Sequence, residues 1–206
     1  MLRSFCLYAL ALFPAAASAA TLAPTGYSYL VAPNSSGSAY EDDTYNGITG
    51  ELTDGISATA DWHVTDGSGI VGPNVGWNNV NPTIQFTFDQ VYDFGTMIVN
   101  MQDGKGAHGV GLASSITVNG LTSPTLIGNG TSAITGWDVT MDLSGLAPTD
   151  TLTVTVTRGY QWTFLSEFTF TGAAPSEVPV PAGLPLLLLG VGSLAALRRR
   201  KPRGRL

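Results

Sequence analysis

Short stretches in which hydrophobic and polar residues alternate strictly dominate the middle of the chain. In residues 83–88 the isoleucine and both phenylalanines fall on one face, and residues 137–143 and 151–157 repeat the pattern. A period of two residues is typical of a strand with one buried face. Weaker versions of the pattern predict further strands over residues 27–31, 97–100, 115–118 and 168–171.

Clusters of Gly, Asn, Asp and Pro separate these stretches, for example at residues 66–69 and 128–130. No segment between the two ends of the chain keeps the helical period of 3.6 residues. Several short strands at this spacing predict an all-β fold, namely an antiparallel β-sandwich or jelly roll. We place this domain at residues 21–172, a length that suffices for one domain with a substantial core.

The first 20 residues predict a signal peptide with a short apolar helix. Arg3 gives the positive start, residues 5–13 form the apolar stretch, and residues 17–19 form a cleavage site of small residues. Signal peptidase is therefore an expected partner. The only cysteine, Cys6, lies in this segment, so the mature protein is expected to contain no disulfide.

The end of the chain has three consecutive parts. Residues 173–181 form a linker that ends in a proline-containing signature, and residues 182–206 form an apolar stretch with a basic end. As a helix, the apolar residues 182–197 would be roughly 24 Å long, slightly short of a membrane core of ~30 Å. They predict a transmembrane helix whose basic end stays in the cytoplasm. The signature comprises Val178, Pro179, Val180, Pro181 and Ala182, and the basic stop comprises Arg198, Arg199, Arg200 and Lys201.

This tail resembles the Val-Pro-Leu-Pro-Ala variant of the PEP-CTERM sorting tails of Gram-negative bacteria, with Val180 in place of the usual leucine. The resemblance implies that an exosortase-type membrane protease cuts near the prolines. The protein would then pass from an inner-membrane intermediate to the cell surface or the extracellular space. A permanent anchor without processing is the alternative, and the proline signature directly before the helix favours cleavage.

The charge distribution restricts the partners of the mature region. All 15 acidic residues, but only Lys105 and Arg158 of the nine basic ones, lie between residues 21 and 177, whereas the whole chain has a net charge of −6. Binding of phosphate needs clustered Lys and Arg, so nucleic acid is excluded as a partner. The acidic field favours cations and neutral partners such as glycans. An acidic surface adapted to salty water, with no specific partner, fits the composition equally well.

Several short sequence segments follow one another in an order that resembles the order in a discoidin-type, galactose-binding-like jelly roll. The pieces are Leu-Thr-Asp-Gly at residues 52–55, Val-Gly-Trp at residues 75–77, the strand at residues 82–88 and an ending at residues 161–168 that contains a Ser-Glu pair. The resemblance implies a fold that binds glycans, lipids or proteins at its loop tips. Many members of this fold also hold a structural calcium ion.

A calcium site is one expectation. Ca²⁺ takes six to eight oxygen ligands from carboxylates and from carbonyls in tight turns. Asp54 precedes a glycine, Asp43 lies upstream, and Glu167 lies near the final strand. The resemblance implies that the first and last strand regions meet, which would let Asp54 and Glu167 share one ion. In the alternative interpretation, Asp54 caps a turn through its own backbone and Glu167 faces solvent.

Glycan binding by such a fold needs an exposed aromatic ring and polar side chains. Arg158 and Tyr160 are the most suggestive pair, because Arg158 is one of two basic residues in the domain. The alternatives are that the tryptophans bury their rings in the core and that the histidines are plain surface residues. The candidates on predicted loops are Arg158, Tyr160, Trp62, His63 and His108, together with Trp77.

Enzyme signatures are weak. Residues 104–109 match the dinucleotide fingerprint, but a strand rather than a helix is predicted after them, so we interpret them as a glycine-rich hairpin. Asp138 and Asp142 share the polar face of one strand, which a solvated face explains. The sequence therefore predicts a non-catalytic, exported binding module for carbohydrate, such as the exopolysaccharide of a biofilm. A structural matrix protein that acts by self-association is the alternative, and a glycoside hydrolase is the least favoured one.

Overall fold

The computed structural model describes residues 19–34, 40–65, 72–128 and 130–175. All of them belong to one compact unit, Met1–Pro175. The expected signal helix, the sorting signature, the terminal helix and the basic end lie outside the described residues. Within the described ranges, no helix has the length and apolar character needed to cross a membrane.

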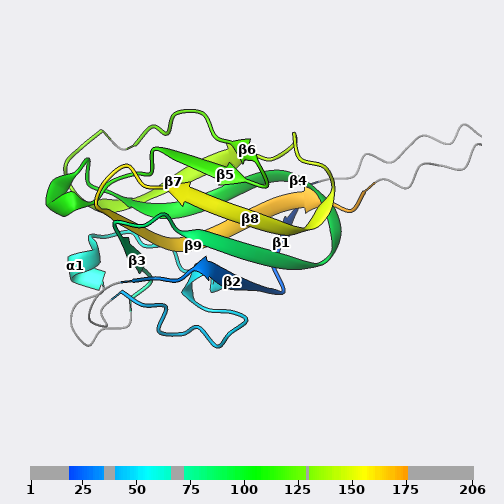
Figure 1. Cartoon of the computed structure of the whole chain (residues 1–206), viewed down its shortest axis with the longest axis horizontal. Helices are drawn as coiled ribbons and strands as arrows, with labels where there is room; N and C mark the ends of the chain where they lie inside the picture. The colour runs from blue at the N-terminus through cyan, green and yellow to red at the C-terminus, as the bar shows by residue number, and fades with distance from the viewer. Residues whose placement is uncertain (1–18, 35–39, 66–71, 129, 176–206) are drawn as a thin grey trace, which may run out of the picture. The chain divides into compact units, whose positions relative to one another are not determined.

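The described residues are mostly β-strands, all of whose mutual pairings are antiparallel, so the prediction of an all-β fold is confirmed (Figure 1). Among the described residues, helix is limited to α1 (Trp62–Thr65) and two 3-10 turns, η1 (Glu51–Thr53) and η2 (Ala107–Gly109). The strands are β1 (Ala20–Leu22), β2 (Gly26–Val31), β3 (Val75–Asn78), β4 (Thr83–Asp103), β5 (Ser115–Val118), β6 (Leu121–Thr122), β7 (Thr135–Asp142), β8 (Thr149–Thr157) and β9 (Trp162–Ala173).

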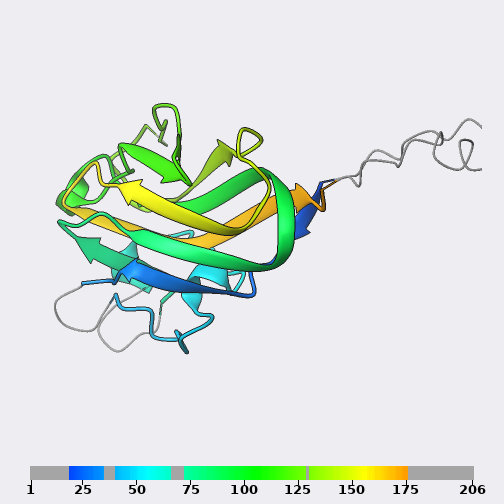
Figure 2. The ribbon, with the colours of Figure 1, turned by 45° about the vertical axis from the view of Figure 1, so that its right-hand side comes forward.

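The central element is β4, a strand of 21 residues. The sequence predicts two separate strands here, at residues 83–88 and 97–100, but the structure joins them into one. The first half of β4 pairs with β2 and β8, and its second half pairs with β7 and β9. The nine-stranded sheet therefore folds over on itself along β4, and its two parts face each other (Figure 2).

Aromatic residues join the two parts of the sheet in the core. Phe86, from the first half of β4, lies with its ring centroid 4.8 Å from that of Phe168 and 5.1 Å from that of Phe170, both in β9. Trp77 in β3 is fully buried in the same core cluster. Trp77 is thus part of the core, as the alternative interpretation of the tryptophans holds, and is not a loop residue available to a ligand.

A β-bulge interrupts β9 at Ser166. Asn100 of β4 pairs with Glu167, but the next residue, Met101, pairs with Leu165, so Ser166 is the extra residue. Leu165 and Phe168 both pack in the core. The bulge therefore turns two successive side chains, those of Ser166 and Glu167, toward the outer side of the sheet, where a regular strand would turn only one.

The glycine-rich segment after β4 is not the expected hairpin, because β5 pairs with β8 and β6 rather than with β4. The segment forms a compact turn around η2 instead. The backbone is left-handed at Lys105, Gly106, His108 and Gly109, with φ values between 51° and 92°. Hydrogen bonds from Gly106 N to Val110 O and from Val110 N to Ala107 O close the turn.

Candidate functional site

A pocket of about 510 Å³ lies beside Tyr160, which follows β8. The apolar part of its lining comes from residues 112–113 and 126–127. Polar groups come from Asp103, Lys105 and Ser114. The pocket thus combines an aromatic ring with hydrogen-bonding side chains, as small-molecule sites do.

The ring of Tyr160 is held by the turn around η2. A Cβ atom on Gly111 would lie 2.4 Å from Tyr160 Cδ2, and one on Gly106 would lie 2.7 Å from Tyr160 Cε1. The two glycines are neighbours, because the same Cβ on Gly111 would lie 3.2 Å from Gly106 N. They therefore cover one side of the ring, and only residues without a side chain allow this approach. Tyr160 remains 37% exposed.

Of the two basic residues of the described region, Lys105 lines this pocket, whereas Arg158 does not line it and contacts the backbone of Tyr160. Lys105 Nζ donates a hydrogen bond of 2.9 Å to Gly130 O, across the pocket. Arg158 Nη1 donates one of 3.3 Å to the carbonyl of Tyr160. Asp103 is 3% exposed, accepts a hydrogen bond from Lys105 N, and lies against Gly128. Arg158 and Tyr160 are thus brought together.

The other predicted ligand residues form a second cluster. The rings of Trp62 and His63 stack with centroids 3.4 Å apart, and the ring of His63 lies 5.5 Å from that of His108. None of the three lines the Tyr160 pocket. Trp137 supports the wall of the Tyr160 pocket instead, because its Nε1 donates a hydrogen bond to Ile127 O and Ile127 lines the pocket.

The predicted calcium residues are only partly brought together. Gly55 N donates a hydrogen bond of 3.0 Å to Glu167 Oε2, which places Glu167 beside Asp54. Burial, together with the negative charge of Asp54, raises the pKa of Glu167 to about 7, although the hydrogen bond from Gly55 opposes this. Burial also raises the pKa of Asp54. Within the described part of the chain, no three His, Cys, Asp or Glu side chains group as metal ligands.

The third predicted ligand, Asp43, is exposed, whereas its neighbour Asp42 is half-buried. Asp42 accepts hydrogen bonds from the hydroxyls of Tyr27 and Tyr29, and burial raises the pKa of both hydroxyls, which keeps them protonated. Asp54 caps its own turn, because Ile56 N donates a hydrogen bond of 2.8 Å to Asp54 Oδ1. This is the turn-capping role of the alternative interpretation.

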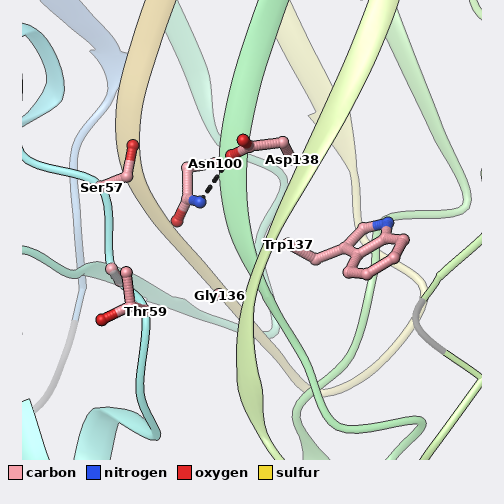
Figure 3. Close-up of a pocket in the computed structure, with 7 residues that line it drawn as sticks. Ser57, Thr59, Asn100, Gly136, Trp137 and Asp138 are labelled. Atoms are coloured by element: carbon pink, nitrogen blue, oxygen red, sulfur yellow. Dashed lines mark hydrogen bonds between the residues drawn. The ribbon is translucent and has the colours of Figure 1, made fainter.

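A second pocket, of about 360 Å³, lies on the outer side of β4 and β7 (Figure 3). Asn100 Nδ2 donates a hydrogen bond of 2.7 Å to Asp138 Oδ1, and Ser57 and Thr59 lie opposite, while Trp137 points away. The sequence pattern predicts that Asp138 lies on the solvated face of a strand. Its partner Asn100 comes from another strand, so only the register of β4 against β7 reveals this pair.

No protein-family model matches the chain. A search of the curated proteins also finds no significant match.

Proposed function

We propose that the β-rich unit is a non-catalytic binding module for carbohydrate and that the pocket beside Tyr160 is its site. One observation carries the proposal: a single aromatic ring is covered by glycine backbone on one side and lines a pocket that also contains the basic residue Lys105. A fixed ring of this kind suits stacking against a sugar. The exposed side chains of Lys105 and Ser114 would bind hydroxyl groups.

The fold assignment that accompanies this proposal is a galactose-binding-like jelly roll, a form of β-sandwich. It is supported by a sheet folded over on itself and by the Ser-Glu pair at the bulge of β9. In the same proposal a structural Ca²⁺ ion would be held by Asp54 and Glu167, with carbonyl groups of the turn. The side-by-side position of Asp54 and Glu167 supports this site.

We also propose that the protein is exported and sorted to the cell surface or the extracellular matrix. The support comes from the sequence alone, namely the signal-like segment 1–20 and the tail 178–206 with its prolines, apolar stretch and basic end. In this proposal an exosortase-type protease removes the tail. Exopolysaccharide outside the cell would then be the natural glycan for the Tyr160 pocket.

The test is a glycan array with the purified protein, followed by titration of any hit against variants. Tyr160→Ala should weaken binding by about ten-fold, since aromatic contacts contribute about 1 kcal/mol beyond their buried area. His63→Ala is the matched control, because His63 is exposed but does not line the pocket. Equal binding by wild type and Tyr160→Ala would reject the site. An array without any hit would reject the carbohydrate function.

A second candidate function, a structural protein that acts by self-association, is favoured by one observation. Leu30 in β2 is 56% exposed, and Ile48, whose carbonyl accepts a hydrogen bond from Tyr27 N of β2, is 59% exposed. Among the described strands, β2 pairs with β4 alone. Exposed aliphatic residues on an edge strand are typical of contacts between chains. Light scattering at rising concentration would test this, and Leu30→Lys with Ile48→Lys should keep the protein monomeric.

A further inference from the structure

The chain contains two histidines, and they lie next to each other in the structure. His63 belongs to α1, whereas His108 belongs to the turn η2 that follows β4. Their ring centroids are 5.5 Å apart and their planes meet at 72°. Both imidazoles are at the surface, since the side chain of His63 is 49% exposed and His108 is also exposed.

We propose that His63 and His108 together bind one divalent transition-metal ion, such as Cu²⁺, Ni²⁺ or Zn²⁺. With a metal–nitrogen distance of ~2.1 Å and a tetrahedral angle at the ion, the centroids of two imidazoles lie roughly 5 to 5.5 Å apart. The observed separation fits this geometry. Imidazole nitrogen prefers these ions, whereas Ca²⁺ and Mg²⁺ prefer oxygen.

Asp61 orients the first ligand. Asp61 Oδ1 lies 3.1 Å from His63 Nδ1 and accepts a second hydrogen bond from the backbone N of His63. The carboxylate fixes the proton on Nδ1, which leaves the lone pair of Nε2 for the metal. A carboxylate that holds the far nitrogen of a ligand histidine is the usual companion of protein metal sites.

The ring of His63 is also fixed by packing. It stacks on Trp62, and Trp62 stacks on the buried ring of Phe164 with centroids 5.3 Å apart. Phe164 stacks on Trp162 in turn, with planes 9° apart. This column of rings, anchored in β9, limits the rotation of His63, so the free protein already holds one ligand in place.

The second ligand is held by an unusual backbone. His108 has a backbone φ of 51°, a value that residues other than glycine seldom adopt. Gly106 and Gly109 flank it with positive φ as well, and the hydrogen bond from Gly109 N to Gly106 O fixes the turn. The left-handed backbone at His108 is part of this hydrogen-bonded turn, which holds the imidazole beside that of His63.

The site would be an open one. No third His, Cys, Asp or Glu completes a metal-binding group among the residues that the structure describes, so two imidazoles leave coordination positions for water or an external ligand. The region holds many acidic and only two basic residues, which raises the local concentration of cations. The proposal is independent of the Tyr160 pocket, because neither histidine lines it.

Titration of the purified, untagged protein with Cu²⁺ in a calorimeter tests the proposal, together with the electron paramagnetic resonance spectrum of the complex. We expect one ion per chain and a spectrum with nitrogen coupling from two imidazoles. His63→Gln and His108→Gln should each lower the affinity by at least ten-fold. Asp61→Asn should lower it by about ten-fold, because the loss of an outer carboxylate costs 10–100-fold.

Ca²⁺ is the control for binding by acidic residues. An excess of Ca²⁺ should not displace Cu²⁺ from the two histidines. Thermal melts in chelator show whether each variant is folded, and we expect them to be, because both histidines are exposed. Full Cu²⁺ binding by the folded double variant would overturn the proposal. A spectrum with oxygen ligands alone, or no Cu²⁺ binding by the wild type, would do so too.

Discussion

Ser166 Oγ donates a hydrogen bond of 2.6 Å to Asn100 Oδ1, at the point where β9 bulges against β4. The same oxygen accepts a hydrogen bond of 3.0 Å from Ala58 N. One residue further, Glu167 accepts from Gly55 N. Two adjacent side chains of one bulge thus attach the segment that contains Gly55 and Ala58 to the outer side of the sheet.

Ser166→Ala should therefore destabilise the protein by about 1–3 kcal/mol, because it leaves the buried groups of Asn100 and Ala58 without a partner. Urea unfolding measures the change. Ser28→Ala is the control, since Ser28 is exposed on β2 and its replacement should change stability by less than about 0.5 kcal/mol. Similar losses in the two variants would contradict the role given to the bulge.

The carboxyl of Glu167 should make stability depend on pH. Its pKa is about 7 in the folded protein, against an ordinary value of 4.5, so the folded chain binds a proton that the unfolded chain releases. The stabilisation is fully present below pH 4.5 and is lost as the pH rises through 7. Urea unfolding in chelator, from pH 4.5 to about pH 8, should show this fall.

Glu167→Gln should remove most of this slope, because the amide does not titrate. Asp142→Asn is the control, since Asp142 is a carboxylate whose pKa is lowered by the hydrogen bond from Ser144. An unchanged slope in Glu167→Gln would assign the pH dependence to other groups. Added Ca²⁺ should flatten the slope of the wild type if the ion binds the ionised carboxyl.

Gly111→Ala should displace the ring of Tyr160 without touching Tyr160 itself, because the new Cβ would lie 2.4 Å from Cδ2. We expect weaker glycan binding and a loss of stability of about 1–3 kcal/mol from the forced shift. Gly145→Ala is the matched control, since its Cβ would meet only Leu121 at 3.8 Å. A Gly111→Ala variant that binds glycan like the wild type would mean that the ring position is unimportant.

Phe164→Ala should cost about 3–5 kcal/mol in the free energy of unfolding. Phe164 is 1% exposed and its ring lies between those of Trp62 and Trp162. Trp137→Ala should cost much less, because Trp137 is 36% exposed. Guanidinium unfolding followed by tryptophan fluorescence would measure both. Equal costs would mean that the ring column is not an anchored part of the fold.

Local pattern was enough to predict most strands. The range 115–118 matches β5, and the alternation at 151–157 falls within β8. The continuity of β4 was not predictable in this way, because residues 89–96 do not alternate and their pairing partners are distant in sequence. The prediction of a hairpin at residues 104–109 was wrong because β5 pairs with β8, which is distant in sequence.

In the candidate sites, too, some features were predictable from the sequence and others depend on long-range contacts. The nearness of Asp54 and Glu167 was expected from the resemblance to a discoidin-type jelly roll, whereas Asn100 and Asp138 meet only through strand register. His63 in α1 and His108 in the turn around η2 are far apart in the sequence and share no motif, so their contact is visible only in three dimensions. Tyr160 was predictable as a candidate, but its support by Gly106 and Gly111 was not.

The length and position of β9 have a mechanical consequence. Tyr160 precedes the first residue of β9, and the chain leaves the strand at Ala173 toward its C-terminal end. If the protein is tethered through that end and holds a polymer at Tyr160, the pulling force runs along β9. Backbone hydrogen bonds to β4, β3 and β1 lie across this direction, so they would be loaded together in shear and would not open one by one.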